Sequence, residues 1–289
     1  MEAVELLHQA EAQLGEGPAW ETRTQTLYWV DILGQRVHLF QHGGDEFVQL
    51  DELVGCLAPT KDGGLILALR NSFARLELAT GKLTRLLTLQ DEPSGNRFND
   101  GKCDPAGRFL AGTMDHEEKE ACGSLYALDL RGNCQRLLSG LRISNGLAWS
   151  PDYRTFYFID TPTRQVQAFD YDLERGQITN PRTVIRVPEA LGWPDGMTSD
   201  MQGHLWIALW GGAQVTCWNP VTGDLLRSVP VPVLQPSACV FGGSDMNELY
   251  ITSARVGLDQ ATLARYPLSG SLFRLKTGVQ GMPTFSFEG

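Results

Sequence analysis

A segment near the start of the chain is repeated, without a gap, close to its middle. GPAWETRTQTLYWVDILGQRVHLF at 17–40 aligns with GLAWSPDYRTFYFIDTPTRQVQAF at 146–169, an offset of 129 residues. The identical residues, numbered in the first copy, are Gly17, Ala19, Trp20, Thr26, Tyr28, Asp31, Val37 and Phe40. A fixed repeat predicts a repeat architecture, which has to be tested before any other fold. An oxygen-bearing side chain precedes each copy, Glu16 and Asn145, so we expect these two side chains to converge in space.

Six short runs with strand character extend the repeat over the whole chain. Their starts are separated by 38, 44, 47, 49 and 44 residues. Each is rich in β-branched or aromatic residues and too short for a confident helix. The runs are TLYWVD (26–31), GLILAL (64–69), RFLAGTM (108–114), TFYFID (155–160), HLWIAL (204–209) and ELYITSA (248–254). A second strand-like run follows each of them, and a third often follows that.

A period of this length with four strands per unit is typical of a β-propeller. We therefore predict an all-β fold, a single domain over 1–289, with six blades of four antiparallel strands around a central channel. The offset of 129 residues then equals three blades, so Glu16 and Asn145 face each other across the channel. To close the ring, EAVELLHQ (2–9) is predicted to complete the last blade beside TFSFEG (284–289), which hides open strand edges.

The charge and composition of the chain argue against some partners and locations. The 289 residues carry a net charge of −10, from 24 Lys and Arg against 34 Asp and Glu, and no long basic run, which argues against a nucleic-acid partner. No stretch approaches the roughly 20 apolar residues needed to span a membrane. The N-terminal MEAVELLHQAEAQ lacks a signal-peptide pattern, and the six scattered cysteines are typical of reduced thiols. We expect a cytoplasmic location and, without cues for a dimer, a monomer.

Four of the six presumed inner strands begin with a carboxylate or carboxamide followed closely by Gly. The segments are LGEGP (14–18), RFNDGK (97–102), ISNGLAW (143–149) and WPDGM (193–197), which supply Glu16, Asn99 with Asp100, Asn145 and Asp195. Oxygen ligands without cysteine or histidine suit a hard divalent cation, and they leave positions open for water and substrate. Taken singly, Asn-Gly and Asp-Gly are turn signals. Four of them in phase at one end of a repeat favour a shared site.

Other residues give weaker signals. Arg97 shares a strand face with Asn99 and could bind a carbonyl or hydroxyls, or form a salt bridge at the rim. For Glu117, in the charged loop at 115–120, the pattern favours a solvated surface charge. Trp193 and Trp210 could stack on a sugar ring or pack against neighbouring loops. The absence of a GxSxG motif leaves a serine-hydrolase mechanism without support.

Several of these segments look like the hallmark segments of the gluconolactonase, regucalcin and luciferin-regenerating-enzyme family. They are LGEGPAW (14–20), RFNDGKCDPAGRFLAGTM (97–114), ISNGLAWSPD (143–152) and PDGM (194–197). The resemblance covers nearly the full chain in the right order. It extends to ALWGG (208–212) and the GG…LYITSAR segment (242–255), which resemble segments of bacterial sugar-lactone lactonases.

The resemblance implies a six-bladed propeller with one divalent metal in the central channel. Glu16, Asn145 and Asp195 would be the metal ligands. Arg97 and Asn99 would hold substrate oxygens, and Glu117 would contact a sugar hydroxyl. The identity of the metal stays open among calcium, magnesium, manganese, zinc and ferrous iron, because an oxygen cage accepts all of them.

The chemistry that the resemblance implies is hydrolysis of a sugar lactone to the open-chain aldonic acid. The metal would polarise the lactone carbonyl, and Asp195 would also act as the base that accepts a proton from the attacking water. A direct attack by Asp195, forming a covalent intermediate, ranks second. Two rival functions remain, hydrolysis of phosphotriesters or other esters at the same metal, and metal binding without turnover. The presence of Asp195 together with Arg97 favours catalysis over a scaffold.

Overall fold

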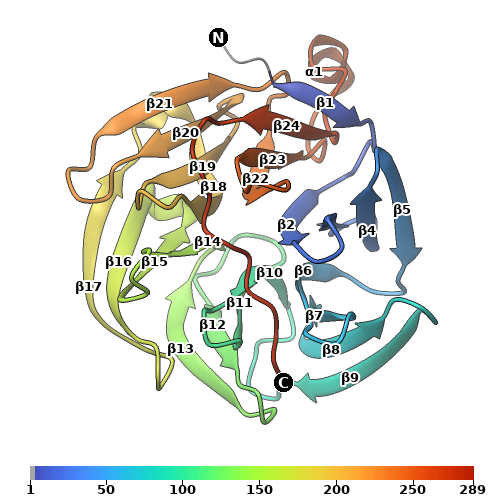
Figure 1. The fold of residues 1–289 in the computed structure, drawn as a ribbon, viewed down its shortest axis with the longest axis vertical. Coiled ribbons are helices and arrows are strands. Elements are labelled where there is room, and N and C mark those ends of the chain that lie inside the picture. The colour runs from blue at the N-terminus through green and yellow to red at the C-terminus, as the bar shows by residue number, and fades with distance from the viewer. Residues whose placement is uncertain (1–3) are drawn as a thin grey trace.

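The chain forms a ring of six four-stranded antiparallel sheets, seen face-on in Figure 1. This computed structural model describes residues 4–289. The prediction of a six-bladed β-propeller is confirmed. The first strand of each blade along the chain lies innermost in blades one to five, where it contacts the innermost strands of the neighbouring blades. The heads of these inner strands therefore meet around one channel.

The first three blades follow one another along the chain, each with its strands in sequence order from the channel to the rim. Blade one contains β2 (Gly15–Glu21), β3 (Thr26–Asp31), β4 (Arg36–Gln41) and β5 (Gly44–Gln49). Blade two contains β6 (Val54–Pro59), β7 (Leu65–Leu69), β8 (Ser72–Glu77) and β9 (Lys82–Thr88). Blade three contains β10 (Asn96–Cys103), β11 (Phe109–Asp115), β12 (Gly123–Leu128) and β13 (Cys134–Leu141).

The last three blades continue the same order until the ring closes. Blade four contains β14 (Ser144–Trp149), β15 (Thr155–Asp160), β16 (Gln165–Asp172) and β17 (Gln177–Arg186). Blade five contains β18 (Trp193–Ser199), β19 (Leu205–Trp210), β20 (Gln214–Trp218) and β21 (Leu225–Pro230). Blade six contains β22 (Pro236–Gly242), β23 (Glu248–Ser253), β24 (Leu272–Lys276) and β1 (Glu5–His8).

Helical structure is confined to short connections. The helix α1 (Gln260–Arg265) joins β23 to β24, and the 3₁₀ turns η1 (Thr161–Thr163) and η2 (Glu189–Leu191) flank the outer strands of blade four. Over residues 4–289, none of the helices has the length and apolar character needed to cross a membrane.

The N-terminal strand closes the ring, as predicted, but its partner differs from the expected one. β1 pairs antiparallel with β24, and Glu5 forms an ion pair with Arg274 across this junction at 2.8 Å. The prediction that 284–289 would be the partner is wrong. Residues 2 and 3 of the predicted strand lie outside the described residues. The reason is that the edge of β24 is already taken by β1, and the backbone of 284–289 hydrogen-bonds to other blades.

The C-terminal segment (281–289) crosses the ring instead of joining a sheet, as the red trace in Figure 1 shows. Its backbone amides donate to carbonyl oxygens of separate blades, from Met282 to Ser199 at 3.0 Å, from Phe287 to Pro59 at 2.8 Å and from Glu288 to Gly107 at 3.1 Å. It thus fastens blades five, two and three at the tail ends of the inner strands.

The core consists of six apolar clusters, one between each pair of neighbouring blades. On β3, for example, Tyr28 and Val30 face blade two, whereas Leu27 and Trp29 face blade six. Both faces of each sheet are therefore buried, which explains why runs such as 26–31 are nearly continuous in apolar residues instead of alternating. Each blade depends on its two neighbours for burial, as in other repeat folds.

Candidate functional site

Every inner strand has an irregular register near its head. The shifts fall between Glu16 and Ala19, Val54 and Cys56, Phe98 and Gly101, Asn145 and Leu147, Pro194 and Met197, and Pro236 and Cys239. A bulge leaves residues out of the ladder and re-aims their side chains. The polar residues that the sequence marks are therefore turned out of the sheets at one end of the ring.

The glycines that follow these polar residues lie in the bulges, not in hairpin turns. A Cβ atom on Gly146 would lie 2.8 Å from the carbonyl oxygen of Asp195, and one on Gly196 would lie 2.3 Å from Cβ of Ala238. Glycine at these positions therefore allows neighbouring inner strands to approach closely beside the channel. The turn interpretation of Asn-Gly and Asp-Gly does not apply to these two.

Five of the predicted site residues line a single cavity of about 640 Å³ at the heads of the inner strands. Glu16 comes from blade one, Arg97 and Asn99 from blade three, Asn145 from blade four and Asp195 from blade five. All five side chains belong to buried residues, although they are polar or charged. The cavity has the size of a small-molecule site.

A chain of hydrogen bonds fixes the amides. Arg97 donates from Nη1 to Oδ1 of Asn99 at 2.7 Å, and Asn99 donates from Nδ2 to Oδ1 of Asn145 at 3.0 Å. Asn145 in turn donates from Nδ2 to Oγ1 of Thr161 at 2.9 Å, and Thr161 donates to the carbonyl oxygen of Pro194 at 2.8 Å. Because the Asn145 nitrogen is used on Thr161, the amide oxygen faces Asn99 and the cavity.

The two carboxylates lack the donors that buried anions need. Among the described residues, 4–289, Asp195 Oδ1 has no hydrogen-bond partner, and Glu16 accepts only from the backbone amide of Gly17, at 3.2 Å. Burial, and then the charge of Asp100, raises the pKa of Glu16 to about 8. Burial, and then the charge of Glu16, raises the pKa of Asp195 well above its usual range. Uncompensated buried carboxylates are costly unless a cation neutralises them.

The residues therefore fit a bound divalent cation. Glu16, Asn145 and Asp195 offer carboxylate and amide oxygens, the ligands that hard cations prefer, and the structure of residues 4–289 gives Oδ1 of Asp195 no partner. Arg97 lies beside them, and burial lowers the pKa of its guanidinium, while the charges of Glu118, Glu16 and Asp195 raise it. Within residues 4–289, its Nε has no hydrogen-bond partner.

Two further predicted residues are not on the cavity wall. Asp100 is buried and accepts the backbone amide of Gly101 at 2.7 Å, but it does not line the cavity. Glu117 forms an ion pair with Lys119 at 2.7 Å, with 66% of its side chain exposed. The structure does not bring Glu117 to the other site residues.

The carboxylate of Asp115 shapes the loop after β11, and this loop brings two neighbours of Glu117 to the cavity wall. Asp115 accepts backbone hydrogen bonds from Glu117, Lys119 and the following residue, which folds the loop around it. Within this loop, His116 and Glu118 line the cavity, and Glu118 has a left-handed backbone with φ of 59°. Sequence reasoning missed both residues. Which side chains of this loop face the cavity depends on the left-handed backbone of Glu118, and the sequence does not reveal that conformation.

Aromatic residues form part of the cavity mouth. Trp193 and Trp210 both line it and are paired across β18 and β19. Trp193 is 40% exposed, and the guanidinium carbon of Arg164 lies 3.5 Å from the centre of its ring. This cation–π contact holds the indole in place at the mouth. The rim also carries Arg142, which sequence reasoning did not single out.

A second group of possible metal ligands, Asp200, His204 and Cys217, lies in blade five. Its carboxylate is already engaged, because Asp200 accepts backbone amides at 202 and 204 and the indole N–H of Trp206 at 3.0 Å. Asp104 shapes the corresponding turn of blade three in the same way, with backbone bonds from 106 and 108. The Asp200 cluster is therefore explained as a turn.

The sequence of the chain matches a known protein family over most of its length. Residues 14–255 match the family described as "SMP-30/Gluconolactonase/LRE-like region". The chain belongs to this family. The match spans Glu16, Arg97, Asn99, Asn145 and Asp195.

The relatives match over nearly their whole length. Regucalcin from Danio rerio is 39% identical over 291 residues, which cover 99% of this chain and 98% of that protein. The structure of a calcium-binding protein, regucalcin, from Agrobacterium tumefaciens superposes with a TM-score of 0.95 at 29% identity, covering 100% of this chain and 98% of the other. A gluconolactonase from Xanthomonas campestris superposes with a TM-score of 0.75 at 25% identity, covering 94% and 89%.

Proposed function

We propose that this protein is a divalent-metal-dependent hydrolase that opens a sugar lactone to the aldonic acid. The observation that carries the proposal is that buried Asp195, whose Oδ1 has no hydrogen-bond partner within residues 4–289, lines a cavity together with Glu16, Asn145 and Arg97. The likeness to a gluconolactonase from Xanthomonas campestris supports the same reaction class.

In this proposal Glu16, Asn145 and Asp195 hold the cation. A divalent cation bound there supplies Lewis-acid polarisation of a carbonyl oxygen. The oxygen donors are compatible with calcium, magnesium, manganese, zinc or ferrous iron, so the metal has to be found by measurement.

Asp195 is assigned a second role as the general base. It takes a proton from the water whose oxygen adds to the lactone carbonyl carbon, and it returns a proton to the ring oxygen as the carbon–oxygen bond breaks. The product is then a hydroxy acid, and Asp195 ends as it began. Direct attack by Asp195 on the carbonyl remains the second mechanism.

The other residues orient the ring. Arg97 and Asn99 line the cavity beside Asn145, and we assign to them the contacts with substrate oxygens. We assign the carboxylate that reaches a sugar hydroxyl to Glu118 instead of Glu117, since only Glu118 lies on the cavity wall. Trp193 offers an apolar surface at the mouth against which the carbon–hydrogen face of a sugar can lie.

The test is acid release, followed by pH, from a panel of aldonolactones and one phosphotriester. Each is measured with chelated enzyme and with enzyme reloaded with single divalent metals. Metal-dependent release from a lactone supports the proposal and identifies both the sugar and the metal. Turnover of the phosphotriester alone would move the assignment to that ester class. Tight metal binding without turnover of any substrate would favour a calcium-binding role, which the Agrobacterium regucalcin structure makes a specific alternative.

A further inference from the structure

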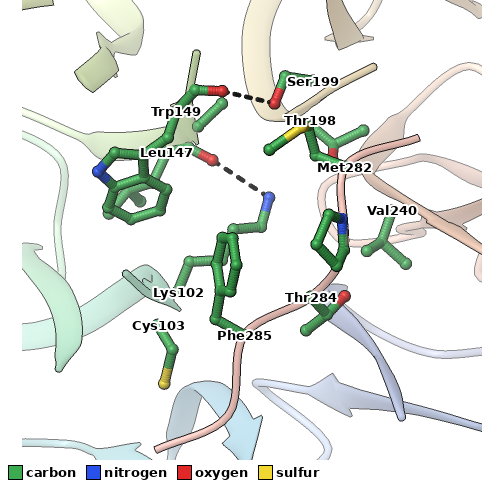
Figure 2. Close-up of a pocket in the computed structure, with 12 residues that line it drawn as sticks. Lys102, Cys103, Leu147, Trp149, Thr198, Ser199, Val240, Met282, Thr284 and Phe285 are labelled. Carbon is green, nitrogen blue, oxygen red and sulfur yellow. Dashed lines mark hydrogen bonds between the residues drawn. The ribbon is translucent and has the colours of Figure 1, made fainter. Parts of the chain in front are cut away.

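A lysine lies inside the channel, between the candidate metal site and the C-terminal segment. Lys102 is near the end of β10, after the bulge that turns Asn99 toward the cavity. Figure 2 shows its side chain directed at the backbone carbonyl of Leu147, with Phe285 and Met282 of the C-terminal segment nearby. The proposed reaction gives this residue no role.

The ammonium group joins two other blades. Nζ donates to the carbonyl oxygen of Leu147 on β14 at 3.2 Å, and it also donates to the carbonyl oxygen of Met197 on β18. Each of these carbonyls lies two residues beyond a proposed metal ligand, Asn145 on β14 and Asp195 on β18. Each also stands at the far end of the bulge that aims its ligand into the channel.

These contacts are partly buried. Lys102 is half-buried and borders a small cavity of about 30 Å³ under the C-terminal segment, which has room for a water molecule. Hydrogen bonds to a charged donor are stronger in such surroundings than in open solvent. The bridge from β10 to β14 and β18 is therefore held firmly.

The surroundings also show what Lys102 does not do. Among residues 4–289, no carboxylate forms a salt bridge with it, although Asp100 and Glu16 act on it through their charges. Burial lowers the pKa of Lys102, while the charges of Asp100, Cys239 and Glu16 raise it. Its hydrogen bonds go to backbone oxygens of the two strands, so its direct contacts are structural links between blades.

We infer that Lys102 is a positioning residue that sets the spacing of Asn145 and Asp195 for the metal by tying β14 and β18 to β10. The inference rests on the proposed function, because it assumes that these two residues hold a cation. It adds a residue that touches neither metal nor substrate.

A role in positioning and a role as a simple counter-charge predict opposite effects on metal binding. Removing a positive charge close to Glu16 should strengthen the binding of a cation, because it removes repulsion. Releasing β14 and β18 should weaken binding, because the ligand oxygens lose their preset geometry. The sign of the change in metal affinity therefore separates the two roles.

The experiment compares Lys102→Met, which keeps the apolar stem but removes charge and donors, with Lys102→Gln, which keeps N–H donors without the charge. Lys276→Met is the matched control, since Lys276 is exposed at the end of β24. Calorimetric titration of chelator-stripped protein with calcium and manganese gives the Kd. Lactone hydrolysis at saturating metal gives kcat and KM.

We expect Lys102→Met to raise the metal Kd about tenfold and to lower kcat about tenfold with KM nearly unchanged, since a misplaced base costs turnover more than binding. Lys102→Gln should show a smaller rise in Kd, and Lys276→Met none. If Lys102→Met does not fold, the direction in which the metal Kd of Lys102→Gln changes decides whether Lys102 is a positioning residue.

An unchanged or lower metal Kd in the folded Met variant, or in the Gln variant, overturns the positioning role. If the wild-type protein binds metal but hydrolyses no lactone, the proposed function fails while the metal titrations still decide the role of Lys102. A wild-type protein that takes up no divalent ion overturns both.

Discussion

Asn99 on β10 donates a hydrogen bond from Nδ2 to Oδ1 of Asn145 on β14 at 3.0 Å. The same Asn145 is held from its other side by Thr161, at 2.9 Å. The amide oxygen of Asn145 is thus oriented by two residues that come from different blades or loops. A ligand oriented in this way loses little freedom when a cation binds, which favours binding.

Asp195→Asn removes the proposed base while keeping the shape of the side chain. We expect kcat to fall by about 10³-fold, within the range of a lost general base, whereas metal binding is weakened but retained through one amide oxygen. Steady-state kinetics and a metal titration check the two effects. Turnover at the wild-type rate would remove Asp195 from the role of base.

Glu16→Gln tests whether Glu16 is one of the metal ligands. The substitution replaces a buried carboxylate by a neutral amide, so the Kd for a divalent cation should rise by about tenfold or more, because a charged ligand is lost. Calorimetry on stripped protein measures the change, with Glu46→Gln, on the exposed strand β5, as the control. An identical titration for Glu16→Gln and wild type would show that Glu16 holds no metal.

Arg97→Ala removes the guanidinium that contacts Asn99. The value of kcat/KM for sugar lactones should fall about 100-fold, since a donor to the substrate and the support of Asn99 are lost together. Arg97→Lys should recover only part of this loss, because an ammonium group lacks the planar donors of Arg. Arg131→Ala, far from the cavity, is the control for a general charge effect. Equal kinetics for Arg97→Ala and Arg131→Ala would make Arg97 a residue of the rim.

Glu118→Gln and Glu117→Gln form a matched pair in the same loop. The first changes a residue of the cavity wall and should raise KM for sugar lactones several-fold. The rise corresponds to the loss of one hydrogen bond, which contributes roughly 1 kcal/mol to the binding free energy. The second changes an exposed side chain paired with Lys119 and should leave KM unchanged. The reverse pattern in KM would restore Glu117 as the sugar contact.

The metal-free protein should have an unusual dependence of stability on pH. Burial raises the pKa of Glu16 from 4.5 to about 8, so the folded chain binds a proton that the unfolded chain has released. Stability is therefore highest below about pH 4.5 for this group and is lost as pH rises toward 8. Thermal unfolding of chelated protein should show a falling Tm over this interval, and Glu16→Gln should flatten the slope. A Tm that rises over the same interval in the chelated wild type would contradict the assignment.

The sequence allowed the ring to be predicted, together with five polar residues that line the cavity, because both depend on the period of the repeat. Glu16 and Asn145 stand at the same phase of two units, and the phase alone places them at the channel. The choice between Glu117 and Glu118 could not be made, since it depends on the three backbone hydrogen bonds that Asp115 accepts and on one left-handed residue. The place of 284–289 was mispredicted because strand character says nothing about which edge is still free.

The pairing of β1 with β24 has a consequence for biosynthesis. The ion pair between Glu5 and Arg274 joins residues that are 269 positions apart, so blade six cannot be completed until the ribosome has made and released residue 276. Until then, the nascent chain carries finished blades with unpaired strand edges at both ends of an open arc. Such edges invite association with other chains, and non-local pairing is slow. We therefore expect the nascent protein to be most vulnerable to aggregation in the interval before β24 pairs with β1, when chaperones would have most to protect.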